Sequence, residues 1–144
     1  MWQFPPADKE KAIGLRSLAS NRFKILVVED EAVIAMDIQS ILRKIGFSDS
    51  EVVFSGEESI QRVASGKTHL VLMDIRLKGR MDGIEAANQI YYGYKVPVVY
   101  ITAFGDENTL KRANGTAQFG YITKPFEERE LQSTVTSALI KAYN

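Results

Sequence analysis

The sequence contains no cysteine, so it can form neither a disulfide bond nor a thiolate metal site. It also has no surplus of charge, because 18 basic residues balance 18 acidic ones. That balance argues against a protein that binds nucleic acid without regard to sequence. No apolar run approaches the roughly 20 residues that a membrane-spanning helix needs, and the first seven residues lack the apolar centre of a signal peptide. We therefore expect a cytoplasmic protein with no membrane or nucleic-acid partner.

The length of the chain suits a single domain with a hydrophobic core. Residues 1–22 differ from the rest, because Pro5 and Pro6 cannot begin a regular element: proline has a fixed φ and no N–H. We expect residues 1–22 to be a tail or linker and residues 23–144 to be the domain.

From residue 23 onward, short β-branched and apolar runs alternate with helical patterns. The runs predict strands at 24–28, 52–54, 70–73, 98–102 and 119–122. Three of them are almost continuously apolar, which is typical of strands buried on both faces of a parallel sheet. Apolar residues at helical spacing predict helices at 34–45, 57–65, 83–92, 106–114 and 131–142. The predicted fold class is α/β, a doubly wound five-stranded parallel sheet flanked by five helices.

Polar residues stand where these strands end. Glu29 and Asp30 follow the first strand, Asp74 follows the third, Thr102 ends the fourth and Lys124 follows the fifth. In doubly wound sheets the functional site lies at the carboxyl ends of the strands. We therefore expect these five side chains to converge at one edge of the sheet.

Three carboxylates held close together repel one another unless a cation joins them. Mg²⁺ suits such a site, because it prefers oxygen ligands and needs only one or two direct carboxylates. Lys124 adds a second positive charge and Thr102 adds a hydroxyl, so the set can surround the oxygens of a phosphoryl group. A carboxylate such as Asp74 can accept that group as an aspartyl phosphate.

Five segments in this order resemble the signature segments of response-regulator receiver domains. The resemblance runs from about residue 23 to residue 143. Its segments are Val27-Val28-Glu29-Asp30-Glu31, Leu72-Met73-Asp74-Ile75, Asp82-Gly83, Ile101-Thr102-Ala103 and Tyr121-Ile122-Thr123-Lys124-Pro125-Phe126. It implies a flavodoxin-like receiver fold and a phosphorylation-controlled signalling switch. The phosphoryl group would come from a histidine kinase or a phosphotransfer protein.

The resemblance also implies the roles of the acidic residues. Asp74 would be the phosphoacceptor. Asp30, Asp74 and the backbone carbonyl of Arg76 would bind Mg²⁺ directly, with Glu29 acting through water. The chain would catalyse only its own phosphorylation and slow dephosphorylation.

The remaining implied roles concern residues of the fourth and fifth predicted strands and their neighbours. Thr102 and Lys124 would bind the phosphoryl group, and the Lys124–Pro125 peptide bond would be cis. Thr102 and Tyr121 would form the switch that carries the signal away. A homodimer would use the 106–114 helix, the fifth strand and the last helix.

The sequence departs from the family in the segment between Asp74 and Asp82, which is one residue longer than usual and has Lys78-Gly79-Arg80 where a proline is common. This departure concerns the shape of the loop. His69, the single histidine, opens the third strand at the edge away from the site, where a structural role is expected.

Four other interpretations compete with the switch. A phosphohydrolase with an Asp nucleophile needs a second Asp two residues later, where this chain has Arg76, which cannot act as an acid. A flavodoxin-type flavin carrier needs a phosphate loop after the first strand, where Glu29 and Asp30 would repel a phosphate. A degenerate receiver that serves as a constitutive binding module would have lost an acidic residue or the lysine. A surface salt-bridge network would place the same charges in solvent.

Overall fold

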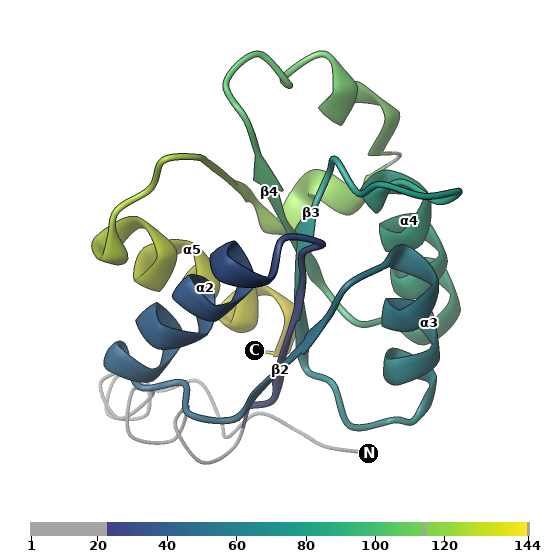
Figure 1. The fold of residues 1–144 in the computed structure, drawn as a ribbon. Helices are drawn as coiled ribbons and strands as arrows, with labels where there is room; N and C mark the ends of the chain where they lie inside the picture. The colour runs from purple at the N-terminus through teal and green to yellow at the C-terminus, as the bar shows by residue number, and fades with distance from the viewer. Residues whose placement is uncertain (1–22, 114, 144) are drawn as a thin grey trace.

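The computed structural model describes residues 23–113 and 115–143. Strands and helices alternate along the chain (Figure 1). The elements are β1 (Ile25–Val28), α2 (Ala32–Lys44), β2 (Ser50–Val53), α3 (Gly56–Ala64), β3 (Leu70–Asp74), α4 (Gly83–Tyr94), β4 (Val98–Thr102), the 3₁₀ helices η1 (Thr109–Ala113) and η2 (Thr116–Phe119), β5 (Tyr121–Thr123) and α5 (Glu128–Tyr143). The predicted tail at 1–22 lies outside the described residues.

All five strands join one parallel sheet in the order β2-β1-β3-β4-β5. From β1 the chain moves outward to β2, and then it returns to the other side of β1 as β3. Val28 is therefore paired with Val53 on one side and Met73 on the other. This reversal places the carboxyl ends of β1 and β3 at the switch point of strand order, the usual place for a site in such sheets. The predicted fold class is confirmed.

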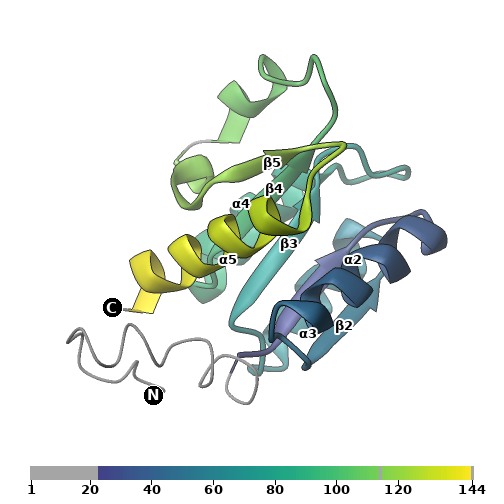
Figure 2. The same ribbon diagram turned by 90° about the vertical axis from the view of Figure 1, so that its left-hand side faces the viewer.

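Two helical layers cover the sheet. Helices α2 and α5 pack on one face, and α3 and α4 pack on the other (Figures 1 and 2). Ile25 and Val27 of β1 belong to the first core cluster, whereas Leu26 and Val28 belong to the second. Successive strand side chains point to opposite faces, so a strand with apolar residues at every position can serve both layers. Among the described residues, no helix combines the length and the apolar character needed to span a membrane.

The predicted helix at 106–114 was wrong. In its place the described residues form one short 3₁₀ helix, η1, in the loop above β4 (Figure 1). A second, η2, follows just before β5. Gly105 and Gly115, which flank the predicted range, take positive φ values of 95° and 88°, so a helix cannot extend past either end of it. The segment also has few apolar residues to hold a longer helix against the sheet, chiefly Leu110 and Ala113. The described part of the chain thus has four α-helices, where five were expected.

The end of the chain is joined to the amino edge of the sheet. The hydroxyl of Tyr143, the last residue of α5, donates a 2.5 Å hydrogen bond to the backbone carbonyl of His69. Nδ1 of His69 accepts the N–H of Lys24 at 2.9 Å, and its ring packs edge-on against Phe23. Burial lowers the pKa of His69, although the charge of Asp49 opposes this effect. The single histidine therefore has a structural role, as the sequence predicts.

Candidate functional site

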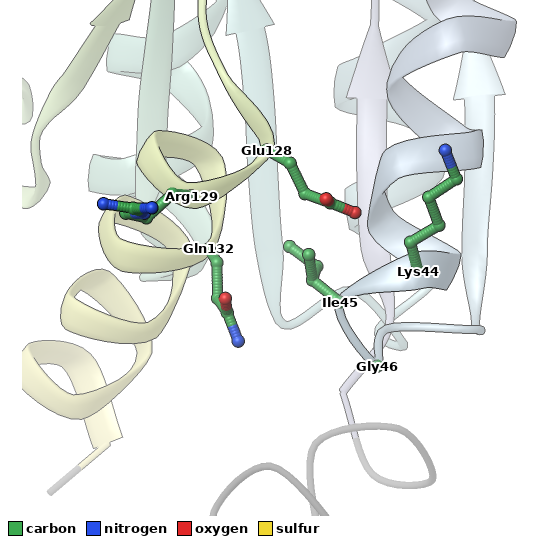
Figure 3. A pocket seen from close by; sticks show the side chains of 6 residues that line it. All are labelled: Lys44, Ile45, Gly46, Glu128, Arg129 and Gln132. Atoms are coloured by element: carbon green, nitrogen blue, oxygen red, sulfur yellow. The ribbon is translucent and has the colours of Figure 1, made fainter.

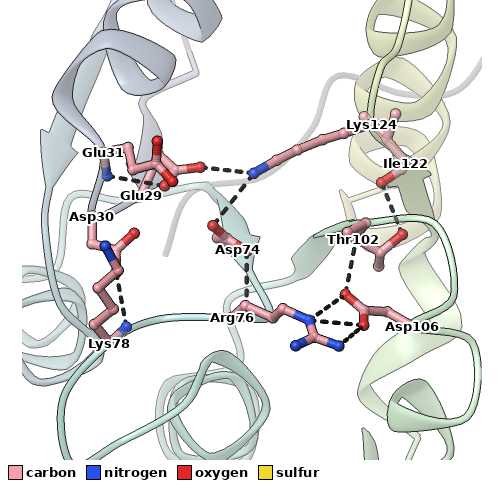
Figure 4. Close-up of polar contacts among 11 residues, drawn as sticks. Glu29, Asp30, Glu31, Asp74, Arg76, Lys78, Thr102, Asp106, Ile122 and Lys124 are labelled. Carbon is pink, nitrogen blue, oxygen red and sulfur yellow. Dashed lines mark hydrogen bonds and ion pairs between the residues drawn. The ribbon is translucent and has the colours of Figure 1, made fainter.

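The carboxyl ends of four strands bring the predicted residues together (Figure 4). Asp74 is the last residue of β3 and Thr102 is the last of β4, while Glu29 and Lys124 directly follow β1 and β5. Glu29, Asp74 and Thr102 are all buried, at 0%, 6% and 3% exposed. Their burial excludes a solvent-exposed salt-bridge network, because the two carboxylates lie beneath the surface.

Lys124 joins the two carboxylates. Its backbone N–H donates to the carbonyl of Thr102 at 2.8 Å, and its peptide bond to Pro125 is cis, in agreement with the prediction. Its Nζ lies 3.0 Å from Oε1 of Glu29 and 3.5 Å from Oδ2 of Asp74. Burial lowers the pKa of Lys124, but the hydrogen bond to Glu29 and the charges of Asp74 and Glu29 outweigh this and raise it overall. Lys124 therefore stays positively charged.

Asp74 has an elevated pKa of about 6. Burial is the main cause, since it disfavours the ionised carboxylate, and the nearby charge of Glu29 adds to it. The N–H of Arg76, which donates to Oδ1 at 2.9 Å, and the charge of Lys124 offset only part of this rise. Asp74 therefore ionises less readily than an ordinary aspartate.

The acidic residues after β1 form a group that can hold a cation. Glu29, Asp30 and Glu31 each offer a carboxylate oxygen, and these oxygens lie within 4.8 Å of one another. Asp74 is not in that group, and Oδ2 of Asp30 accepts the N–H of Lys78 at 2.8 Å. Mg²⁺ prefers oxygen ligands, and the carboxylates of Glu29 and Asp74 share the single positive charge of Lys124. The donor set therefore fits Mg²⁺, with Glu31 as a nearby carboxylate to which the sequence interpretation gave no role.

The hydroxyl of Thr102 is directed toward β5. It donates at 3.4 Å to the carbonyl of Ile122 and lies 3.3 Å from the hydroxyl of Thr123. Tyr121, at the start of β5, is 50% exposed. An ordinary core aromatic would be buried, whereas this tyrosine lies at the surface on the same strand that contacts Thr102.

Asp106 belongs to the site but was missed as a site residue. Asp106 is 1% exposed. Its carboxylate accepts hydrogen bonds from the side chain of Arg76, from Nε at 2.9 and 3.0 Å and from a terminal guanidinium nitrogen at 2.5 Å. It also accepts the backbone N–H of Ala103 at 3.1 Å. The hydrogen bond from Arg76 is the main reason that the pKa of Asp106 is lowered. The available signal was a pair of opposite charges, Arg76 two residues after Asp74 and Asp106 four residues after Thr102. They lie in the loops that follow β3 and β4, and these strands are neighbours only in the folded sheet.

The start of α4 lies directly behind the phosphoacceptor candidate. Asp82 caps α4 in a capping box with Glu85, and its other oxygen accepts a hydrogen bond from Arg112 at 2.9 Å. The N–H of Gly83 donates to the carbonyl of Ile75 at 3.0 Å. A Cβ on Gly83 would lie 2.0 Å from the backbone oxygen of Asp74. Only glycine permits this approach, which explains the Asp82-Gly83 motif physically.

A groove of about 500 Å³ lies between the end of α2 and the first turns of α5 (Figure 3). Its lining residues are Lys44, Ile45, Gly46, Glu128, Arg129 and Gln132. None of them is among the strand-end residues described above. The groove is therefore separate from the carboxylate cluster.

Comparisons with known proteins agree with this geometry. The model of the response regulator receiver domain matches residues 25–136. The transcriptional regulatory protein PdtaR of Mycobacterium tuberculosis is 33% identical over 135 residues, which cover 94% of this chain and 62% of that protein. The signal receiver domain of a modulated diguanylate cyclase from Desulfovibrio desulfuricans G20 is 32% identical with a TM-score of 0.75, covering 83% of this chain and 94% of that one.

A second solved structure is similar to the same degree. The N-terminal domain of a response regulator/sensory box/GGDEF 3-domain protein from Carboxydothermus hydrogenoformans is 34% identical with a TM-score of 0.75, covering 82% of this chain and 94% of that one. The chain spans 62% of the length of the curated relatives it matches. Because the family model covers most of the sequence and the fold is shared, the chain belongs to the response regulator receiver domain family.

Proposed function

We propose that this chain is a phosphorylation-controlled signalling switch that accepts a phosphoryl group on Asp74. The donor is a phosphohistidine of a partner histidine kinase or phosphotransfer protein. The observation that carries the proposal is a buried carboxylate at the end of β3, 3.5 Å from the Nζ of Lys124 and beside the acidic group of β1.

The transfer follows from the chemistry of these groups. An oxygen of the Asp74 carboxylate attacks the phosphorus, a P–O bond forms, the P–N bond of the donor breaks, and its electron pair stays on the imidazole. Lys124 is charged and already next to Asp74, so it can neutralise a phosphoryl oxygen. Rotation of the Thr102 side chain away from Ile122 would bring its hydroxyl to a second phosphoryl oxygen.

Asp30, Asp74 and the backbone carbonyl of Arg76 would hold Mg²⁺, with Glu29 acting through water. When bound, Mg²⁺ supplies positive charge to a phosphoryl oxygen. Asp30 holds the loop after β3 through the N–H of Lys78, so it also positions the segment that begins at Asp74.

The alternative is a degenerate receiver that acts as a constitutive binding module. Nothing about the site favours it, because Glu29, Asp30, Asp74 and Lys124 are all present at the strand ends. We also propose a cytoplasmic location, slow dephosphorylation and a homodimer through the region 106–114, β5 and α5. Within 106–114 the described residues form the 3₁₀ helix η1 in place of the expected helix.

The test is phosphorylation by a small donor. Incubation with acetyl phosphate and Mg²⁺ should add the mass of one phosphoryl group, and hydroxylamine should remove it. Asp74→Asn should abolish the addition, and Asp30→Ala should remove the Mg²⁺ dependence along with most of the rate. Asp37→Asn, at an exposed carboxylate of α2, is the matched control and should behave as wild type. Full phosphorylation of Asp74→Asn would refute the assignment.

A further inference from the structure

We propose that the guanidinium of Arg76 leaves Asp106 and binds the phosphoryl group when Asp74 is phosphorylated. This exchange of partners loosens the loop between β4 and η1. The inference rests on the proposed function of Asp74. It gives the two residues opposing roles. Arg76 is a positioning residue for the phosphoryl group, and Asp106 competes with that group for the guanidinium of Arg76.

The starting arrangement is an ion pair between a buried residue and an exposed one. The carboxylate of Asp106 is buried, whereas the side chain of Arg76 is 71% exposed. Arg76 donates from both Nε and a terminal nitrogen, at distances of 2.5 to 3.0 Å. Its exposed guanidinium can move without disturbing the core, but the carboxylate cannot follow it into solvent without moving the backbone.

The phosphoryl group would form within reach of this guanidinium. The backbone N–H of Arg76 already donates to Oδ1 of Asp74 at 2.9 Å, so the arginine side chain starts next to the acceptor carboxylate (Figure 4). The charge of Asp74 also contributes to the raised pKa of Arg76, although the hydrogen bond to Asp106 contributes most. A phosphoryl group carries more negative charge than the carboxylate it replaces, and guanidinium binds phosphate oxygens in bidentate fashion. Phosphorylation therefore introduces a competitor for Arg76.

Loss of Arg76 would act on η1 through Asp106. The remaining hydrogen bond to the carboxylate comes from the N–H of Ala103, within the same loop. The backbone carbonyl of Asp106 accepts the N–H groups of Thr109 and Leu110, so Asp106 is hydrogen-bonded to the first turn of η1. A buried carboxylate without its cation is costly, and the loop must shift to hydrate it. The far end of η1 stays fixed to α4 by the separate pair between Arg112 and Asp82.

The test is the affinity for beryllofluoride, a phosphoryl mimic, in the presence of Mg²⁺, measured on the full chain by fluorine NMR. If Arg76 exchanges partners, Asp106→Asn frees it and should tighten binding roughly fivefold or more, while Arg76→Gln should weaken binding to a similar extent. In the Arg76→Gln background, Asp106→Asn should have no further effect. The control is Arg112→Gln, which breaks the ion pair between Arg112 and Asp82. Like the pair between Arg76 and Asp106, it joins the chain after β3 to the chain after β4. This variant should leave the affinity unchanged.

The sign of the Asp106→Asn effect decides between the proposal and a merely supporting role. A pair that only holds the site in shape predicts weaker binding in Asp106→Asn, and weaker or unchanged binding would overturn the proposal. Asp106→Ser, which keeps an acceptor for Ala103, must tighten binding in the same way. The Nε–H signal of Arg76 gives a second readout, since beryllofluoride should move it to the same position in wild type and Asp106→Asn.

The outcome also separates this inference from the proposed function. If Asp74→Asn binds beryllofluoride as well as wild type does, the assignment of Asp74 fails and the inference fails with it. If Asp74→Asn loses binding but Asp106→Asn does not tighten it, Asp74 remains the acceptor and only the exchange of partners is wrong.

Discussion

At the scale of single residues, the site depends on which atoms approach Asp74. The ammonium of Lys124, just after β5, contacts the carboxylate of Asp74. The backbone N–H of Arg76, in the loop after β3, donates to the same carboxylate. Gly83 approaches from behind, so closely that no side chain fits between the start of α4 and the carbonyl of Asp74. The position of the acceptor therefore depends on a residue that has no side chain.

Gly83→Ala should destabilise the protein and slow its phosphorylation. The added Cβ would lie 2.0 Å from the backbone oxygen of Asp74, and neither the strand end nor the helix start can yield easily. We expect a loss of about 1–3 kcal/mol in the free energy of unfolding, measured with urea.

The control is Gly93→Ala in the same helix. A Cβ at Gly93 meets no atom within 4 Å, so alanine there should stabilise by up to about 1 kcal/mol. Equal stability of the two variants would mean that the close approach behind Asp74 does not exist in solution.

At the scale of elements, helix α5 is fixed at both ends by different means. Its buried residues, which include Leu131 and Val135, pack on the sheet, while its last residue, Tyr143, is bonded to the start of β3 through His69. Burial raises the pKa of Tyr143 to about 12. The phenol is thus neutral in the folded protein well above the pH at which it ionises when unfolded.

Tyr143→Phe should change how stability depends on alkaline pH. The folded-state pKa is raised, so the contribution of the neutral phenol is complete below pH 10, the ordinary pKa, and is lost as pH rises toward 12. Over that window the wild type should lose about 2–3 kcal/mol relative to Tyr143→Phe, from a shift of about two pKa units.

The measurement is urea unfolding of both proteins at several pH values between 9 and 12. Below pH 10 the wild type should be more stable by about 1 kcal/mol, because the variant lacks the hydrogen bond to His69. Tyr94→Phe, at an exposed tyrosine of α4, gives the effect of losing a surface phenol. Parallel curves for wild type and Tyr143→Phe would contradict the buried state of this hydroxyl.

At the scale of the molecule, the doubly wound order brings together charges that are far apart in sequence. Glu29 and Lys124 are 95 positions apart, and Asp74 and Lys124 are 50 apart. Each is fixed at a strand end, so the cluster exists only when the whole sheet is formed. A cation that binds this cluster should therefore stabilise the complete fold.

Mg²⁺ should raise the thermal midpoint of unfolding at neutral pH. A tenfold excess over the dissociation constant contributes about 1.4 kcal/mol, because the ion binds only the folded chain. Asp30→Asn should remove most of this gain, whereas Asp37→Asn should keep it. An equal rise in all three proteins would show that Mg²⁺ binds elsewhere, and removing the ion with a chelator should reverse the rise in wild type.

The amino-acid sequence by itself determined the class of fold and the edge that carries the site. Continuous apolar runs such as 70–73 and 98–102 indicate buried parallel strands, and the polar residues Asp74 and Thr102 mark where those strands end. These signals are local, because each depends on a few consecutive residues. The five segments of the resemblance likewise identify the family without any knowledge of contacts.

Only the tertiary structure decided the partners of the charges and the form of the segment between β4 and β5. The sequence pattern favoured a helix at 106–114, whereas the folded chain has the short 3₁₀ helix η1 within that range, preceded by the buried carboxylate of Asp106 bound to Arg76. An ion pair across 30 residues has no period in the sequence and follows from the adjacency of β3 and β4. Strand order, which sets that adjacency, is a property of the packed sheet as a whole, and for this reason the contact between Arg76 and Asp106 could not be predicted from local pattern.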